Sequence, residues 1–309
     1  MTQVSIVIPA YNAAAYLAET LYSVCESTHQ DFEVVVVDDG STDTTSEVVK
    51  TIAKFDRRVR LLSQSNCGMS AARNRGIASS NSEYIALIDS DDIWHPEKLR
   101  WQLQRLQDHP DHDFSYTDFT TFYGATPAHF GQERRTGDID PDKSGWVYHH
   151  LILDNLALPS SVLFTRNAWR ALGAFRCDNQ KTDDWEFLVR ASQQFKFIRL
   201  AESLVLYRQH PQSLSRRLAI TNDHEQMREC LLLRFGLKSP DGTVVDLRQL
   251  QEFRHAGCCN FADAHCARGN IQLGLREFSR LLWYESRRTA TATKLAKSLF
   301  RRAFPKSNA

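Results

Sequence analysis

Clusters of polar and acidic residues directly follow three short apolar runs in the first ninety residues. They are residues 9–12 (PAYN), 38–43 (DDGSTD) and 89–92 (DSDD). An aromatic ring at such a position can stack on a nucleobase, and a carboxylate can accept hydrogen bonds from a base N–H or a ribose hydroxyl. Closely spaced carboxylates can also hold a hard cation, because Mg²⁺ takes oxygen ligands and is usually shared with substrate phosphates. These residue types therefore predict a site for a phosphorylated nucleotide and a divalent metal ion.

The elements that must position these clusters alternate between two periodicities. Short runs rich in Val, Ile and Leu predict strands at 4–8, 33–37, 59–62 and 84–88. Helical patterns lie between them, at 13–26, 43–55 and 69–79. Such strands are typical of a parallel sheet buried on both faces, and the alternation indicates an α/β, Rossmann-like sheet flanked by helices. Ligands bind at the carboxyl ends of the strands in such sheets, which is where the clusters fall.

The remainder of the chain is less regular. A helix is expected from Pro96, since proline suits the first helical position, to about Asp108. Residues 114–160 are irregular and predict mixed short strands and loops that shape an acceptor pocket. A strand is predicted at 161–164, a helix at 184–195 and a strand at 197–207, and beyond about Arg217 the sequence becomes helical and rich in arginine.

Several separate motifs follow one another in a recognisable order. They read S-I-V-I-P-A-Y-N, V-V-V-V-D-D-G-S-T-D, N-C-G-M-S-A-A-R-N-R-G-I, I-D-S-D-D-I-W, L-G-A-F-R, T-D-D-W-E-F-L-V-R and Y-R-Q-H-P-Q-S-L-S. Each motif alone is weak, but together they resemble the inverting family 2 glycosyltransferases of the GT-A fold. The resemblance covers about residues 2–217. It implies a catalytic domain over 1–217, with a nucleotide-sugar-binding half (1–110), an acceptor-binding half (111–217) and a helical C-terminal extension (218–309).

The resemblance also implies roles for individual residues. The donor-binding set is expected to be Pro9, Ala10, Tyr11, Asn12, Asp38, Asp39, Asn66, Arg73, Asp89 and Ser90. In that set Tyr11 packs on the base, Asp39 reads the base imide, and Arg73 lies near the base and diphosphate. Asp91 is the expected metal ligand, with Asp89 and His210 completing the metal–diphosphate site.

The catalytic base is expected in the Asp183–Asp184 pair, at the position of an E-D element in the family. Asp184 matches the general base, which takes the proton of the acceptor hydroxyl. Asp183 stands where glutamate is commoner, so the choice between the two carboxylates stays open. Taken from the residues alone, the pair could also simply cap the following helix.

The function expected from the resemblance is inverting transfer of a sugar from a nucleoside-diphosphate sugar to an acceptor hydroxyl, with Mn²⁺ or Mg²⁺ as cofactor. The expected nucleobase of the donor is uracil, with thymidine and guanosine donors left open. The expected acceptor is a saccharide or a lipid-linked molecule, in cell-surface polysaccharide or glycolipid synthesis. The alternatives are a non-catalytic nucleotide-sugar-binding protein and a nucleotidyltransferase of related fold. The second usually has a Gly-rich, Lys-containing loop after its first strand, which PAYN does not supply.

Composition limits the partners and the compartment. The net charge of +1 gives no whole-chain reason to expect a nucleic acid. Seven cysteines without a C-x-x-C pair, no signal-peptide pattern and no apolar stretch near the ~20 residues of a membrane span predict a soluble or peripheral cytoplasmic protein. Cysteines and histidines between 255 and 266 have no zinc-site spacing, which favours packing in a helical hairpin.

The segment from Arg268 to Lys306 is basic and amphipathic, with ten Lys or Arg against two Glu. Such a helix can lie in an anionic membrane interface, which would bring the enzyme to a lipid-linked acceptor at the inner face of the membrane. The alternative, a helix packed on the catalytic domain, is favoured.

Overall fold

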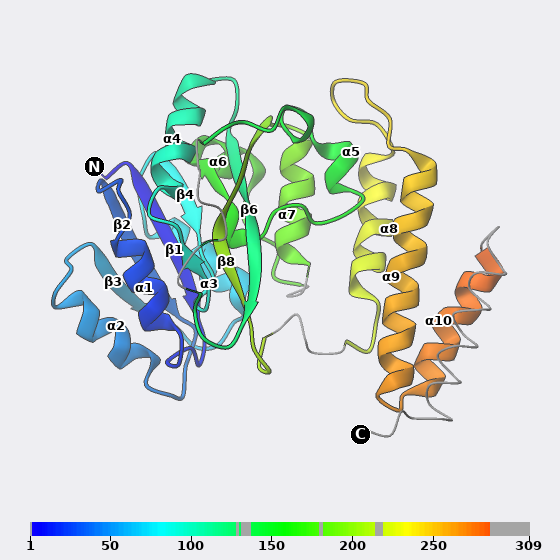
Figure 1. Ribbon diagram of the computed structural model, residues 1–309, viewed down its shortest axis with the longest axis horizontal. Coiled ribbons are helices and arrows are strands. Elements are labelled where there is room, and N and C mark those ends of the chain that lie inside the picture. Colours follow the sequence, from blue (N-terminus) through cyan, green and yellow to red (C-terminus); the bar gives the residue numbers. More distant parts are fainter. Residues whose placement is uncertain (1, 128–129, 131–136, 179–181, 214–218, 285–309) are drawn as a thin grey trace.

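The computed structural model describes residues 2–127, 130, 137–178, 182–213 and 219–284. An eight-stranded mixed sheet forms its centre, in the order β3-β2-β1-β4-β7-β6-β8-β5 (Figure 1). The strands are β1 Val4–Ala10, β2 Phe32–Asp38, β3 Val59–Ser63, β4 Tyr84–Leu87, β5 Ile93–Trp94, β6 Phe114–Tyr123, β7 Leu163–Thr165 and β8 Phe197–Gln209.

The first four strands form the predicted parallel sheet. β1 pairs in parallel with β2 on one side and β4 on the other, and β2 pairs in parallel with β3. Every residue of β1 is buried, as the run of aliphatic side chains predicts for a strand covered on both faces. The carboxyl ends of these strands therefore lie at one edge of the sheet, and the prediction of an α/β, Rossmann-like mixed sheet is confirmed.

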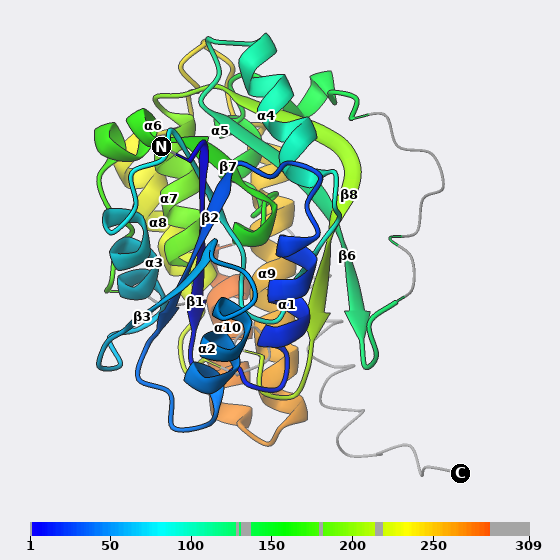
Figure 2. The same ribbon diagram turned by 90° about the vertical axis from the view of Figure 1, so that its left-hand side faces the viewer.

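Helices cover both faces of the sheet. They are α1 Leu17–Cys25, α2 Thr45–Ala53, α3 Met69–Ala78, α4 Lys98–Asp108, α5 Tyr148–Leu151, α6 Arg166–Leu172 and α7 Asp183–Ser192, with short 3-10 turns at Pro141–Lys143 and Pro159–Ser161. One core contains side chains of α1, α2 and α4 against one face, and the other contains those of α3, α5, α6 and α7. Figure 2 shows α1 and α3 on opposite sides of the parallel strands.

The expectation of only short strands between 114 and 160 was wrong for its first ten residues. These residues form one strand, β6, which pairs in parallel with β8 along its length. The local sequence mixes Thr and Asp with aromatic residues, so its own pattern is weak. The strand is stabilised by a partner that lies far along the chain, and two register shifts near Asp118 bend it.

Three helices follow the sheet: α8 Asp223–Phe235, α9 Leu247–Ala267 and α10 Ile271–Tyr284. Leu231, Val245 and Leu250 belong to the same buried core as α5 and α7, so α8 and the start of α9 pack against the sheet-bearing part of the chain. Figure 1 shows α8 beside α7, with α9 on its outer side and α10 beyond.

The hairpin of α9 and α10 explains the cysteines of the C-terminal region. Cys258, Cys259 and Cys266 are buried with Ala262 and Phe278 in a small apolar core between the two helices. No three His, Cys, Asp or Glu side chains of the described residues are grouped so as to hold a metal ion. Packing is therefore the role that the structure gives these cysteines.

The first part of the basic segment, through Ser279, packs on α9 of the extension. The favoured prediction, packing on the catalytic domain, is therefore not confirmed for these residues. Residues 285–309, on which the membrane alternative depends, lie outside the described residues. None of the helices described here has the length and apolar character needed to cross a bilayer.

Candidate functional site

The turns after β1 and β2 are joined to each other. The Asn12 N–H donates to Ser41 Oγ at 2.9 Å, and the Thr42 N–H donates to Asn12 Oδ1 at 2.8 Å. Asn12 has a φ of 50°, a left-handed conformation that asparagine tolerates better than most residues. Pro9 and Ala10 are buried at the end of β1. The joined turns leave the neighbouring Tyr11 side chain 52% exposed at the carboxyl edge of the sheet, where a base could stack.

Asp39 is buried and connects the end of β2 to the start of α3. Its Oδ1 accepts from Gln64 Nε2 at 2.7 Å and from the Cys67 N–H at 2.8 Å, and its Oδ2 accepts from the Gly68 N–H at 2.8 Å. A carboxylate has about four lone-pair positions, so one acceptor position remains for a ligand. Asp39 therefore both shapes this loop and keeps the capacity to accept the N–H of a base.

A glycine allows this close approach of two loops. Gly40 has a φ of 78°, and a Cβ at this position would lie 2.8 Å from the backbone nitrogen of Asn66. Any side chain here would push the two loops apart. The exposed Asn66 is thus held near the end of β2, beside Asp39, as the donor-site prediction requires.

Asp38 has a local role in the turn after β2. Its Oδ1 accepts from the Ser41 N–H at 3.0 Å, and Oδ2 accepts from the Ser46 hydroxyl. Burial alone would raise the pKa of Asp38, but these hydrogen bonds lower it below its ordinary value. The geometry supports a role for this carboxylate in stabilising the turn.

Arg73 connects the segment after β4 to the start of α7. This α3 residue is 2% exposed, and its Nη2 donates to Asp89 Oδ1 at 2.8 Å while its Nη1 donates to Asp183 Oδ2 at 3.3 Å. The Ser70 hydroxyl, one turn earlier in α3, also donates to Asp183 Oδ2. A buried guanidinium shared by two carboxylates links α3 to the segment after β4 and to a residue 110 positions further along the chain. The sequence predicts that Arg73 lies near the diphosphate, but it does not predict this bridge between two carboxylates.

Asp91 and His210 meet across the site. His210 Nε2 lies 3.0 Å from Asp91 Oδ2, and its ring packs on Tyr16 with the centroids 4.6 Å apart. Burial, together with the charge of Asp89, raises the pKa of Asp91, and His210 opposes this shift. Asp89 and Ser90 are half-buried in the same segment. Carboxylate and imidazole groups are suitable ligands for Mn²⁺, and Asp91 and His210 offer one of each. Among the described residues Asp89 does not complete a three-ligand group with them, and two protein ligands fit a cation that is shared with a diphosphate.

A buried network behind this segment was missed by the sequence reasoning. Asp92 is fully buried, and its oxygens accept from the Arg208 N–H at 3.0 Å and from the Ser160 hydroxyl. Ser160 Oγ in turn accepts from the Asp89 N–H at 3.0 Å. Because Asp92 is held through backbone and hydroxyl donors, it orients the loop that carries Asp89 and Asp91. The sequence signal for this role is Asp92 itself, which is a further carboxylate at the fourth position of the D-x-D-D segment.

Arg208 holds the other side of the same loop. Its Nε donates to the Asp91 carbonyl at 2.8 Å, its Nη2 pairs with Glu19, and its guanidinium stacks on Tyr16 and Phe122 at 4.9 and 4.7 Å. It lies two residues before His210 in the Y-R-Q-H string. The string alone does not show that Arg208 is buried, because a buried arginine and a surface arginine can have the same local sequence.

The Asp183–Asp184 pair begins α7, and its two carboxylates have different surroundings. Asp183 is 2% exposed, and one of its oxygens accepts from both Ser70 and Arg73. Asp184 is half-buried, and its contact with a side chain is a long hydrogen bond of 3.4 Å from Asn155 Nδ2. Burial and the charge of Asp183 raise the pKa of Asp184 to about 6, although Arg73 opposes the shift. Of the pair, Asp184 has the environment of a general base.

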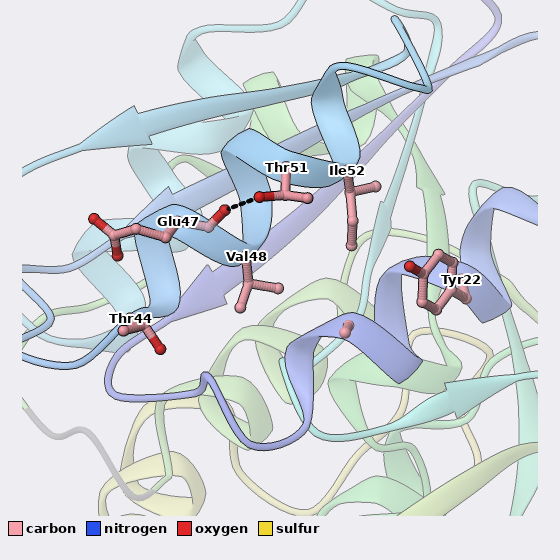
Figure 3. A pocket seen from close by; sticks show the side chains of 7 residues that line it. Tyr22, Thr44, Glu47, Val48, Thr51 and Ile52 are labelled. Carbon is pink, nitrogen blue, oxygen red and sulfur yellow. Dashed lines mark hydrogen bonds between the residues drawn. The ribbon is translucent and has the colours of Figure 1, made fainter.

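A groove elsewhere on the surface is separate from these residues. It lies between α1 and α2 (Figure 3) and is lined by Ala18, Tyr22, Thr44, Glu47, Val48, Thr51 and Ile52. None of the predicted site residues belongs to this lining. The candidate site is therefore the carboxyl edge of the sheet, where Tyr11, Asp39, Arg73, Asp89, Asp91, Asp184 and His210 gather around the ends of β1, β2, β4 and β8 and the start of α7.

Comparisons with known proteins find related glycosyltransferases. A stretch of 118 residues is 35% identical to the "Putative teichuronic acid biosynthesis glycosyltransferase TuaG" of Bacillus subtilis, covering 38% of this chain and 46% of the relative. The chain spans less than half the length of the curated relatives that it matches.

Solved glycosyltransferases share the fold over nearly the whole chain. TarS residues 1–349 of S. aureus in complex with UDP-GlcNAc superpose with a TM-score of 0.61 at 16% identity, covering 97% of this chain and 92% of that one. Mannosyltransferase PcManGT of Pyrobaculum calidifontis, in complex with GDP-Man and Mn²⁺, superposes with a TM-score of 0.59 at 20% identity, covering 99% and 88%. At these identities the likeness establishes the GT-A fold.

The family assignment comes from the sequence model of "Glycosyl transferase family 2", which matches residues 5–164, just over half of the chain. The matched range includes β1 to β4, the D-x-D-D segment and Arg73. This chain belongs to glycosyltransferase family 2.

Proposed function

We propose that this protein transfers a sugar from a nucleoside-diphosphate sugar to an acceptor hydroxyl, with inversion at the anomeric carbon. The observation that carries the proposal is the bridge of Arg73 between Asp89 and Asp183, because it joins the donor-side carboxylates to the carboxylate pair that offers a base. The donor is a UDP-sugar in this proposal, and two structural neighbours were solved with UDP-GlcNAc and with GDP-Man. The acceptor is a saccharide or lipid-linked hydroxyl in cell-surface polysaccharide or glycolipid synthesis; this chain and TuaG share part of their sequence.

The donor side of the site follows from its exposed and buried groups. Tyr11 offers an exposed ring for the base, and Asp39 keeps one acceptor position for a base N–H. Asp89 faces the ribose and phosphates, held by Arg73 and by the hydrogen bond of its N–H to Ser160. Because these groups are fixed before the donor binds, little ordering is required on binding.

Mn²⁺ or Mg²⁺ would be held by Asp91 and His210, whose side chains meet, with Asp89 in the same segment. When bound, the cation would supply positive charge for the departing nucleoside diphosphate. The protein contributes the alignment: Arg208 donates to the Asp91 carbonyl, and Asp92 anchors the loop from behind. The family commonly uses such cations, and PcManGT was solved with Mn²⁺.

Asp184 is the proposed base. It stands at the first turn of α7, half-buried, close to the fixed pair of Arg73 and Asp183. Its carboxylate takes the acceptor proton while the acceptor oxygen attacks the anomeric carbon from the face opposite the leaving diphosphate. A base with a raised pKa holds the proton more strongly, and at neutral pH it is still mainly ionised.

The single test of the function is a transfer assay that separates it from the alternatives. Purified protein is incubated with a panel of nucleotide sugars, Mn²⁺ and candidate acceptors, and both nucleoside diphosphate and glycosylated product are measured. Equimolar release of diphosphate and product supports glycosyl transfer. In a second reaction with a nucleoside triphosphate and a sugar 1-phosphate, formation of a nucleotide sugar and pyrophosphate would indicate nucleotidyl transfer. Donor binding without any product in either reaction would indicate a binding protein.

Asp91→Ala should remove the metal dependence of donor binding. With a proposed ligand lost, the affinity for the donor in the presence of Mn²⁺ should fall by on the order of 10–100-fold, towards the value without metal. Calorimetry with and without Mn²⁺ measures both affinities. Asp111→Ala, a change at an exposed carboxylate away from the site, is the matched control. An Asp91 variant that keeps the wild-type affinity and metal dependence would refute the assigned role.

The pH dependence of kcat/KM should have an acid limb near pH 6. Since the pKa of Asp184 is raised to about 6 and the base must be deprotonated, kcat/KM is at its full value above this pH. It should fall about ten-fold for each further pH unit below the pKa. Initial rates between pH 4.5 and 8, with donor and metal binding checked at each pH, measure the limb. A limb near the ordinary aspartate pKa of about 4 would exclude Asp184 as a base in this environment.

A further inference from the structure

The loop after α5 runs beside the proposed base. Trp185, which follows Asp184 in the chain, donates its indole N–H to the Leu151 carbonyl at 2.7 Å. Four residues later, Asn155 Nδ2 donates to Asp184 Oδ2 at 3.4 Å. The loop therefore contacts two successive residues of α7. Its position decides how the amide of Asn155 meets the carboxylate.

An arginine of the C-terminal extension holds this loop from the other side. Arg228 of α8 is 6% exposed; its Nε donates to the Ile152 carbonyl at 3.2 Å and its Nη2 to the Leu153 carbonyl at 3.0 Å. The same guanidinium lies over the Trp185 ring, 5.2 Å from its centroid. Only a planar, forked donor can reach two neighbouring carbonyls and stack at the same time, so lysine is no substitute here.

The arginine is itself fixed by a buried carboxylate. Glu225, which is 2% exposed, pairs with Arg228 Nη1 at 2.6 Å and with Arg254 of α9 at 2.5 Å. The contacts thus run from α9 through α8 to the loop and from the loop to the base. Figure 1 shows α8 standing beside α7, between it and α9.

We propose that Asn155 is a positioning residue for the Asp184 carboxylate, and that Arg228 of the C-terminal extension sets the place of Asn155. The extension is then part of the active site. The inference rests on the proposed function of Asp184 as base. Residues beyond 217 then control the base, although they lie outside the segment that resembles the family in sequence.

The chemistry of the contact supports this role. An asparagine that faces an ionised carboxylate must present its N–H₂ group, because the carboxylate only accepts. Burial and the charges of Asp183 and Asp89 raise the pKa of Asp184, and Arg73 opposes the shift. An N–H donated to the carboxylate favours its charged form and so acts in the same direction as Arg73. From α8, His224 faces the Trp185 ring. Removing the Asn155 amide should therefore shift the titration of Asp184 to higher pH.

The experiment compares the full-length wild-type protein with Asn155→Ala, Arg228→Lys and Arg228→Met. Arg248→Met, at an exposed α9 arginine in the same extension, is the matched control. We expect Asn155→Ala to lower kcat by on the order of ten-fold, with an unchanged donor KM, and to move the acid limb of kcat/KM to higher pH. Arg228→Lys should also lower kcat and move the acid limb to higher pH, but to a smaller degree. Arg248→Met should match the wild type.

A second readout needs no turnover. The carboxyl ¹³C signal of Asp184, assigned by its loss in Asp184→Asn, titrates with the carboxylate, and its midpoint should move upward in Asn155→Ala and Arg228→Lys. An unchanged midpoint in Asn155→Ala overturns the inference, as does a fall in kcat that only follows a lower melting temperature. If the midpoint moves while the wild type transfers no sugar, the coupling holds and the proposed function fails.

Discussion

Asp184→Asn should lower kcat by about 10²–10⁴-fold, the usual contribution of a positioned general base, while leaving donor affinity within a few-fold of the wild type. An amide has the shape of the carboxylate but cannot take the acceptor proton. In the proposed site the donor binds through Tyr11, Asp39 and Asp91. Asp184 makes no hydrogen bond to these three among the described residues. Steady-state rates at saturating acceptor, with calorimetric titration of the donor, measure the two effects separately.

Asp183→Asn is the comparison that makes this result specific. Asp183 is 2% exposed and bonded to Ser70 and Arg73, so its substitution should lower stability together with activity. Asp184→Asn should melt near the wild-type temperature. Full turnover in Asp184→Asn, with loss of turnover in a folded Asp183→Asn, would reverse the assignment and make Asp183 the base.

The parallel part of the sheet could be predicted from the sequence because its signal is local. The four Val residues of 34–37 are all fully buried, and the neighbouring β1 has the same two-sided apolar character. Polar and turn-forming residues follow three of these runs directly, as PAYN, DDGSTD and DSDD, so the strand ends and their chemistry were identified together. Tyr11, Asp39, Asp89 and Asp91 thus lie at the predicted edge of the sheet, although their individual roles stay predictions.

The contacts that hold the site could not be predicted, because their partners are far apart in the chain. Arg73 reaches Asp183 across 110 residues, and Arg208 reaches Asp91 across 117. The hydrophobic periodicity of a sequence contains no information about such a pairing. A buried arginine shared by two carboxylates cannot be told from a surface arginine by its local sequence. β6 was missed for the same reason, since its pairing with β8 decides its conformation.

Arg73→Met should cause a large loss of stability. Methionine keeps much of the buried volume but leaves Asp89 and Asp183 without their shared cation, and Asp183 is 3% exposed at its side chain. Removing one partner of a buried ion pair typically costs about 3–5 kcal/mol, because an uncompensated charge remains in the interior. Arg75→Met is the control on the same helix: Arg75 is exposed and its hydrogen bond to Gln64 is 3.4 Å long.

Unfolding in urea, monitored by circular dichroism, would give the free energies of unfolding of the Arg73→Met and Arg75→Met variants. A surface substitution away from special features usually stays within about 0.5 kcal/mol, so Arg75→Met should unfold close to the wild type. If Arg73→Met lost no more stability than Arg75→Met but bound the donor more weakly, the arginine would act on the diphosphate, as the family resemblance implies. If it lost both stability and transfer, the bridge is what holds the donor carboxylates and the base in one geometry, and that outcome follows from the contacts seen here.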